Sequence, residues 1–375
     1  MIFLDNASTT RLCDEAKSEI EKSHDLFYNP SAVYGKSLEI RKMLDEAKQN
    51  ICRALGVSYN NNLIITGSAT EANNLAIFGS IKKTDSQLVF GAGEHPSVYN
   101  CAFELKARGF NVVFAPLAKT GEVDLEILSK ILEKPTAFVS IMTVSNETGA
   151  INNIQKISKL IRRTNPNAIF HSDGVQAFGK IPTNVLNMDV DLFSISAHKI
   201  GGPKGIGALY VKNIKKLKPI IFGGGQEFGL RSGTENTMFT LAFGEIAKSL
   251  KIKEYFDEIN EIRNYVRNFF EGKDGVEINS PKDASPYVLS LSFCGVRGET
   301  LVHVLEGENI ILGTGSACSS KKGALNRTLE EMGKTKEENE GAVRISFSKE
   351  TTLDEVKQAC NIIYDSYLKL KEKLK

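Results

Sequence analysis

Residues 194–211, SISAHKIGGPKGIGALYV, hold the pattern that decides the fold. The small and apolar residues up to Ala197 are typical of a buried strand, and the residues after the Gly-Pro turn read as a second strand. His198 and Lys199 interrupt the apolar pattern between the two. A lysine at the end of a buried strand is either a surface residue or a desolvated amine that can form a Schiff base. This stretch alone leaves both interpretations open.

Working outward, short β-branched runs alternate with amphipathic stretches of ten or more residues. The runs are LIIT (63–66), SQLVFGAG (86–93), NVVFAPL (111–117), TAFVSIMTV (136–144), AIFHSD (168–173) and VDLFSISA (190–197). This alternation predicts an α/β fold with a mostly parallel sheet covered by helices on both faces. Such sheets bind ligands at the loops beyond the carboxyl ends of their strands.

The alternation of short apolar runs and amphipathic stretches ends near residue 236. A long helical pattern, residues 237–272, predicts an interdomain helix or two joined helices, and a second α/β unit with shorter strands follows it. A chain of 375 residues is also too long for one ordinary core. We therefore expect a large domain, residues 13–248, and a small domain made of residues 1–12 and 249–375.

Composition excludes several classes of protein. The net charge of +2 gives no general case for nucleic-acid or membrane binding. The first residues, MIFLDNASTT, lack the basic and apolar regions of a leader peptide, so we expect a cytoplasmic protein. The six cysteines form no CxxC pair, and no His/Cys spacing suits zinc, so free thiols and no metal site are expected.

Polar residues follow three of the predicted strands. They are His95, Asn146, Asp173 and Gln176. An aspartate at such a strand end faces the ligand crevice, where it would keep the nitrogen of a pyridine ring protonated. Asn146 and Gln176 could bond the phenolic oxygen of that ring, and His95 could stack on it or move protons. Taken singly, each residue could instead serve as a turn or helix cap.

Two further stretches suggest groups that bind anions. In GSATEANN, a strand leads through Gly67 and Ala69 into a helix that starts near Thr70. A helix N-terminus attracts phosphate, although Thr70 and Glu71 could instead form a plain capping motif. Arg344 lies inside an apolar strand, AVRISFS, where it would grip a substrate carboxylate or form a structural salt bridge. The glycine-rich loop 223–236, which contains Thr234, is long enough to be a lid or a subunit contact.

Cys318 differs from the other cysteines. Its surroundings, GTGSACSSKKGALNR, have no apolar periodicity, which predicts an exposed and mobile loop. Lys321 and Lys322 favour the thiolate, which is the attacking form of the side chain. An incidental surface cysteine is the alternative.

Ser196 and Lys199 also match S-x-x-K, the acyl-serine signature of penicillin-binding proteins. That signature needs the serine at a helix start together with SDN and KTG motifs. Ser196 ends a strand, and neither partner motif occurs in the sequence. This interpretation therefore has little support.

Taken together, these motifs resemble the cysteine desulfurases of the NifS/IscS type, which are fold-type I enzymes dependent on pyridoxal 5'-phosphate (PLP). The matching stretches run almost end to end: LDNASTT, NPSAVYG, GSATEANN, EHPSV, SNETG, HSDGVQ, SAHKIGGPKG, GGGQEFGLRSGT, GSACSS and VRISFS. The resemblance implies a large domain with a seven-stranded, mostly parallel sheet, and a smaller α/β domain that carries the Cys318 loop.

The resemblance also implies roles for single residues. Lys199 would hold PLP as a Schiff base and act as acid and base, Asp173 would pair with the ring nitrogen, and His95 would stack on the ring. Gln176 would contact the ring oxygen, and Asn146 the ring oxygen or the substrate carboxylate, which Arg344 binds. The phosphate would be surrounded by Ala69, Thr70, Ser196, His198 and, from the partner subunit of an obligate homodimer, Thr234.

Cys318 would attack the sulfur of PLP-bound L-cysteine, release alanine and keep a persulfide, and it is the one candidate for a transient iron–sulfur ligand. The persulfide sulfur would pass to an acceptor, such as an iron–sulfur scaffold or a tRNA-thiolation protein. Residues after Cys318 read SSKKGALNR, which departs from the family pattern and puts the acceptor's identity in doubt. Alternatives are a selenocysteine lyase, another enzyme of class V, or a non-catalytic sulfur-carrier subunit.

Overall fold

The computed structural model describes residues 1–58, 62–82, 85–314 and 325–374. A seven-stranded sheet dominates the first two thirds of the chain, in the order β2-β8-β7-β6-β5-β3-β4. Its strands are β2 (Leu63–Thr66), β3 (Gln87–Gly91), β4 (Val112–Ala115), β5 (Thr136–Ser140), β6 (Ile169–Asp173), β7 (Leu192–Ser196) and β8 (Gly207–Val211). Only β8 runs antiparallel to its neighbours, because the short turn after Lys199 returns the chain directly beside β7.

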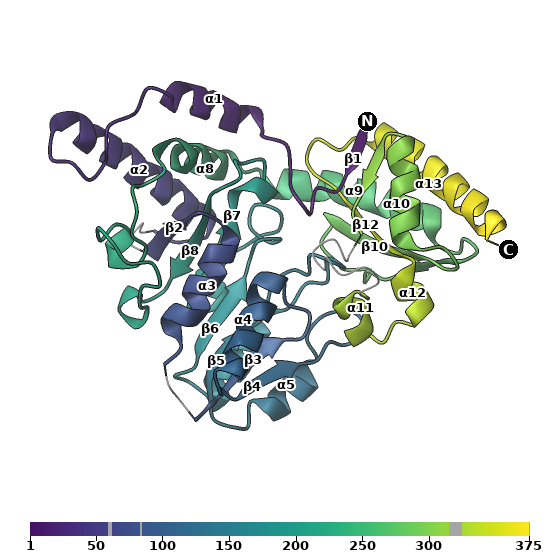
Figure 1. The fold of residues 1–375 in the computed structure, drawn as a ribbon, viewed down its shortest axis with the longest axis horizontal. Helices are drawn as coiled ribbons and strands as arrows, with labels where there is room; N and C mark the ends of the chain where they lie inside the picture. Colours follow the sequence, from purple (N-terminus) through teal and green to yellow (C-terminus); the bar gives the residue numbers. More distant parts are fainter. Residues whose placement is uncertain (59–61, 83–84, 315–324, 375) are drawn as a thin grey trace.

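Helices cover both faces of this sheet (Figure 1). One apolar cluster joins the sheet to α3 (Ala69–Ser80) and α4 (Pro96–Ala107). A second cluster, on the other face, includes side chains from α2 (Gly35–Ala54), α5 (Leu125–Ile131), α6 (Ile154–Thr164), α7 (Val185–Met188) and α8 (Thr237–Ser249). In α6, Ile154, Ile157 and Ile161 are buried at the three- and four-residue spacing of one helix face. α1 (Asp14–Ser23) packs on α8.

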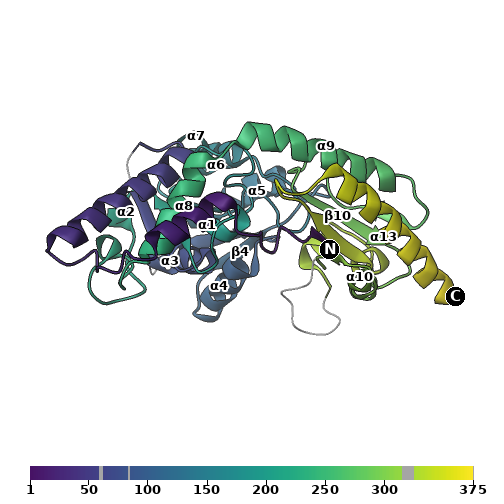
Figure 2. The ribbon, with the colours of Figure 1, turned by 90° about the horizontal axis from the view of Figure 1, so that it is seen from above.

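The remaining elements gather beside this body. β9 (Val276–Ile278), β10 (Val288–Phe293) and β12 (Ala342–Ser346) form an antiparallel sheet, and β1 (Ile2–Leu4) pairs in parallel with β11 (Ile310–Leu312). The helices here are α9 (Ile252–Phe270), α10 (Gly298–Gly307), α11 (Arg327–Glu331), α12 (Lys336–Glu340) and α13 (Leu353–Lys373). Figure 2 shows α9 running from the large body along this C-terminal part. Because β1 pairs with β11, the N-terminus lies with the C-terminal elements.

The long helical pattern of the sequence is two helices, α8 and α9, which are separated by Leu250 and Lys251. The prediction had allowed for two joined helices. None of the helices in the described ranges has the length and apolar character needed to cross a bilayer.

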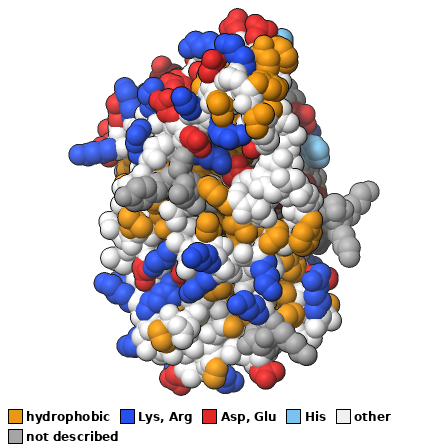
Figure 3. All heavy atoms as spheres, turned by 90° about the vertical axis from the view of Figure 1, so that its left-hand side faces the viewer, with side chains coloured by type: hydrophobic (Ala, Val, Ile, Leu, Met, Phe, Trp, Pro, Cys, Tyr) orange, Lys and Arg blue, Asp and Glu red, His pale blue; other side chains and the backbone are white. Residues whose placement is uncertain are grey.

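One end of the large body presents apolar side chains to solvent. The segment between α1 and α2 and the loop from residue 219 to 236 lie at the left of Figure 1, and Figure 3 shows that hydrophobic and basic side chains mix on this face. The apolar side chains exposed in these segments include Phe27, Val33, Tyr34, Phe222 and Phe228.

Candidate active site

A cavity of about 290 Å³ opens where the carboxyl ends of the central strands meet the C-terminal elements. Among the residues named from the sequence, those that line it are Ala69, Thr70, His95, Asn146, Asp173, Gln176, His198, Lys199 and Arg344. Ser196 and Thr234 are not among the lining residues. Cys318 lies outside the described residues, but Thr314, shortly before it, lines the cavity.

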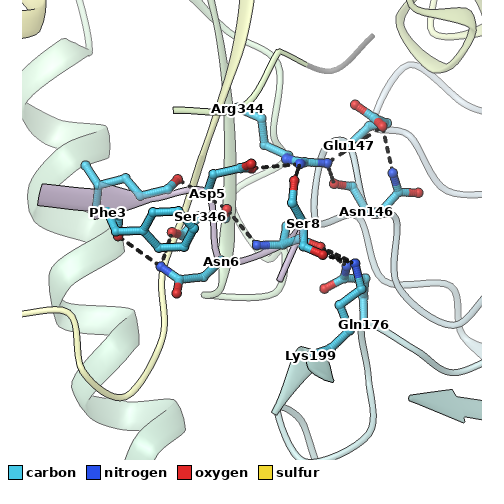
Figure 4. Close-up of polar contacts among 12 residues, drawn as sticks. Phe3, Asp5, Asn6, Ser8, Asn146, Glu147, Gln176, Lys199, Arg344 and Ser346 are labelled. Atoms are coloured by element: carbon cyan, nitrogen blue, oxygen red, sulfur yellow. Dashed lines mark hydrogen bonds and ion pairs between the residues drawn. The ribbon is translucent and has the colours of Figure 1, made fainter. Parts of the chain in front are cut away.

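Lys199 ends the short helical turn Ala197–Lys199 that follows β7. Its Nζ donates to the backbone carbonyls of Ala7 and Ser8, each at 2.7 Å (Figure 4). The N-terminal segment is fixed there because the Thr10 amide and hydroxyl both donate to the carbonyl of His198. That residues 7–10 cover the lysine could not be predicted from local patterns, because this contact depends on β1 joining the C-terminal elements.

Asp173 and His95 are joined by a chain of hydrogen bonds. The Asp173 carboxylate accepts from the Val175 amide at 3.0 Å and from Nδ2 of Asn73 at 2.8 Å. Asn73 also donates to the hydroxyl of Ser97, which lies 2.8 Å from Nδ1 of His95. Burial lowers the pKa of His95, against the opposing effect of Asp173. The neutral ring is therefore favoured at neutral pH.

Gln176 is held at both ends of its amide. Its Nε2 donates to the carbonyl of Ala7 at 3.0 Å, and its Oε1 accepts from Nζ of Lys180 at 2.7 Å. Lys180 is only 3% exposed, and burial lowers its pKa to about 7. This second lysine near the site was missed in the sequence, because a lysine four residues after Gln176 looks like any exposed helical residue.

The N-terminus of α3 forms one end of the cavity. Backbone amides in the first turn of a helix have no carbonyl partner within that helix, and they favour anions. Ser196 pairs with Gly207 across β7 and β8, and a Cβ at Gly207 would come within 2.8 Å of the Ala69 amide nitrogen. Glycine at 207 thus lets the sheet approach the helix start. The Ser196 hydroxyl is buried there with no hydrogen-bond partner among the described residues.

Arg344 projects from β12 toward the cavity from the opposite side (Figure 4). Its Nη2 donates to Asp5 at 2.9 Å and to the hydroxyl of Ser8 at 3.0 Å, while Nη1 donates to the carbonyl of Asn146 at 3.0 Å. Its Nε is buried without a partner among the described residues. The salt bridge that the sequence analysis gave as one alternative is therefore present, with Asp5 at 2.9 Å and with Glu147 at 3.8 Å.

Glu147 and Arg327 connect the site to the chain that follows the Cys318 segment. Burial raises the pKa of Glu147, whose carboxylate accepts from Asn326 at 2.9 Å. Arg327, at the start of α11, donates to the carbonyl of Ala92 at 2.9 Å and to that of Glu94. The chain that leaves the Cys318 segment is thereby tied to the turn that carries His95.

Comparison with known proteins identifies this arrangement. Residues 2–359 match the family model described as aminotransferase class-V. The chain therefore belongs to the class-V aminotransferase family. A NifS/IcsS protein homolog of Lactobacillus delbrueckii subsp. bulgaricus is 37% identical over 382 residues, with 99% of each chain covered. The cysteine desulfurase IscS of Dictyoglomus turgidum is 34% identical, over 96% of this chain and 93% of its own length.

A solved structure named NIFS-like protein has a TM-score of 0.91 at 30% identity, over 97% of this chain and 98% of its own. Within the class-V family, the chain is thus a PLP-dependent cysteine desulfurase of the NifS/IscS type. The predicted α/β fold with a seven-stranded, mostly parallel sheet is confirmed.

The residues of the cavity fit this cofactor. The desulfurase has first-turn amides of α3 at the cavity and, behind the cavity lining, the Ser196 hydroxyl, which has no partner among the described residues; a phosphate needs such donors. It has a carboxylate oriented by two donors, as a pyridine nitrogen requires. It also has a lysine at the end of a central strand, and the aldehyde of PLP needs such an amine to form a Schiff base.

Proposed function

We propose that this cavity removes sulfur from L-cysteine, releases L-alanine and leaves the sulfur as a persulfide on Cys318. The observation that carries the proposal is the convergence of Lys199, Asp173 and Arg344 on one cavity, although they come from three different parts of the chain. A lysine for a carbonyl, a carboxylate for a ring nitrogen and a guanidinium for a carboxylate are what an amino acid on PLP needs.

Bound PLP supplies an electron sink for breaking bonds next to the substrate amine. Lys199 would hold it and would afterwards move the proton at the α-carbon, Asp173 would pair with the ring nitrogen, and His95 would stack on the ring. Gln176 and Asn146 supply donors for its oxygen. Its phosphate would be held by Ala69, Thr70, Ser196 and His198, together with Thr234 of the partner subunit.

Arg344 binds the substrate carboxylate. In the protein alone, its Nη2 is shared between Asp5 and Ser8. A substrate carboxylate would compete with Asp5 for this donor, or use the unpartnered Nε. This gives the residue two uses: it docks the N-terminal segment beside Lys199 and it orients cysteine.

The sulfur-transfer step needs a soft nucleophile, which is the thiolate of Cys318. Its Sγ attacks the sulfur of the bound cysteine, so that an S–S bond forms and the Cβ–S bond of the substrate breaks. The electron pair of that bond remains on the carbon fragment, which takes up a proton and leaves as alanine. Thr314 at the cavity and Asn326 at Glu147 place both flanks of the Cys318 segment near the site.

Substitution of single cysteines tests this proposal against its alternatives. Cys318→Ala should abolish persulfide formation and sulfide release from L-cysteine, whereas Cys294→Ala, at a half-buried cysteine of the C-terminal part, should leave both unchanged. Undiminished sulfide release by Cys318→Ala would contradict the persulfide step and favour a lyase of the selenocysteine type. A protein that binds no PLP would instead be a non-catalytic carrier.

The exposed apolar end of the large body supports a homodimer. Phe27, Val33 and Phe222 are 79, 92 and 82% exposed, which is unusual for large apolar side chains gathered on one face. Ser31 donates to Glu235 across the two segments, and Thr234 beside it is exposed. The exposed Thr234 can thus reach into a second subunit. Phe222→Asp should yield monomers in sedimentation experiments and weaken PLP binding, whereas Leu186→Asp on the exposed side of α7 should do neither.

The proposed acceptor is a cytoplasmic protein with an acceptor thiol, such as an iron–sulfur scaffold or a tRNA-thiolation protein. Sulfur labelled in L-cysteine should pass through Cys318 to such a protein and not to its Cys-free variant. Label that reaches neither acceptor class would contradict this part of the proposal and leave the desulfurase activity untouched.

A further inference from the structure

Asn73 is a buried amide that contacts both residues flanking the proposed ring site. It lies in α3, is fully buried, and has no contact with solvent that would explain its polarity. Its Nδ2 donates one hydrogen to Oδ2 of Asp173 and the other to Oγ of Ser97, each over 2.8 Å. One amide group therefore joins the Asp173 side of the site to the His95 side.

The direction of each hydrogen bond follows from one donor that is certain. The backbone N–H of Ser97 donates to Nδ1 of His95 at 3.1 Å, so Nδ1 is an acceptor. The Ser97 hydroxyl, 2.8 Å from the same nitrogen, must then donate to it as well. Its lone pairs are left to accept from Asn73. The remaining ring hydrogen of a neutral His95 is consequently on Nε2.

The orientation of the Asn73 amide follows in the same way. A flipped amide would place Oδ1 against the carboxylate of Asp173, where two acceptors repel each other. In the orientation observed, Oδ1 is buried and has no hydrogen-bond partner among the residues that the structure describes. A buried oxygen without a partner is tolerated only where the two donors of the same amide are needed.

We propose that Asn73 is a positioning residue, which orients the carboxylate of Asp173 and, through Ser97, keeps His95 neutral with its hydrogen on Nε2. This inference rests on the proposed roles of Asp173 and His95. His95 then presents a hydrogen-bond donor to the cavity in the resting enzyme, and the task of accepting the first proton falls to Lys199. Burial also lowers the pKa of His95, which agrees with a neutral ring.

The test measures directly which nitrogen of the His95 ring carries the hydrogen. The full-length chain, with and without added PLP, is labelled with ¹⁵N-histidine, and the ring nitrogens of its five histidines are recorded by NMR. Three variants are compared. Asn73→Leu keeps the side-chain volume but removes both amide donors. Ser97→Ala removes only the hydroxyl that links Asn73 to His95, and Asn74→Leu is the third variant. Asn74 is the matched control, because its amide donates only within its own helix, to Thr70.

The wild type should show an acceptor resonance for Nδ1 of His95 and a protonated Nε2. Asn73→Leu and Ser97→Ala should shift the Nδ1 resonance, and Asn74→Leu should not. Asn73→Leu should also raise the Kd for PLP about tenfold, the size expected for one hydrogen bond to a charged group. Ser97→Ala should raise that Kd less, because Asn73 still holds Asp173.

His95 resonances that stay at wild-type values in Asn73→Leu would overturn the inference. So would a wild-type ring protonated on Nδ1. Both results leave the desulfurase function intact, because they concern the position of a hydrogen and not the reaction. A wild-type chain that binds no PLP would contradict the proposed function instead, while the apo-protein resonances would still test Asn73.

Discussion

The cavity has two walls that differ in how their side chains are held. On the wall formed by the seven-stranded sheet, called here the sheet wall, Asp173 and Gln176 each form hydrogen bonds to two other groups. The side chains that donate to them, Asn73 and Lys180, are buried. On the wall formed by the C-terminal elements, called the C-terminal wall, Arg344 shares Nη2 between two acceptors, and its Nε has no partner within the described part of the chain. We propose that the sheet wall holds the cofactor in advance, whereas Arg344 on the C-terminal wall exchanges partners when substrate arrives.

The largest effect should come from the sheet wall. Lys199→Ala should remove the visible absorbance of bound PLP and lower kcat by about 10³-fold or more, because covalent attachment and proton transfer are both lost. Lys204→Ala, at an exposed lysine five residues further on, is the control. Absorbance and desulfurase kinetics measure the outcome. Retained activity in Lys199→Ala would show that the sheet wall does not hold the cofactor in this way.

A smaller effect is expected from the C-terminal wall. Arg344→Gln should lower kcat/KM for L-cysteine by about 10- to 100-fold, the range for a lost hydrogen bond to a charged group, mainly through a higher KM. Asp5→Asn breaks the same ion pair but keeps the guanidinium. It should therefore leave KM unchanged or lower it. Equal losses in both variants would mean that Arg344 acts only as a structural salt bridge.

The smallest effect concerns Lys180 behind the sheet wall. Burial lowers its pKa to about 7, so between pH 7 and 10 the unfolded chain binds more protons at this residue than the folded chain. The wild-type free energy of unfolding should therefore rise with pH in this window, relative to Lys180→Met, by about 1 kcal/mol per pH unit. Urea unfolding of both proteins at pH 7.5 and 9.5 measures the slope. Parallel slopes would show that Lys180 is not held neutral above pH 7.

Much of the sheet wall could be predicted from the sequence, because strand periodicity and strand ends are local signals. The alternation of apolar runs located β5, β6 and β7, and polar residues at their ends indicated Asp173 and Lys199. The supporting residues could not be found in this way. Asn73 reaches Asp173 across 100 positions of the sequence, and in its own helix it looks like any other asparagine.

The C-terminal wall was less predictable for another reason. Arg344 was assigned either to a salt bridge or to substrate binding, and the choice depended on where the N-terminal segment lies. β1 pairs with β11, more than 300 residues away in sequence, and this pairing brings Asp5 and Ser8 to Arg344. No local pattern encodes a contact of that kind. The role of Cys318 remains a prediction, since it lies outside the described residues.

We propose that Lys199, and not the buried Lys180, carries the cofactor. The most direct measurement is to load the wild-type chain with PLP, reduce it with borohydride, digest it and identify the modified lysine by mass spectrometry. We expect a pyridoxyl group on the peptide that contains Lys199. Lys180 is the competing amine, because its pKa of about 7 also makes it nucleophilic at neutral pH. A pyridoxyl group on Lys180, or on no lysine, would contradict the account.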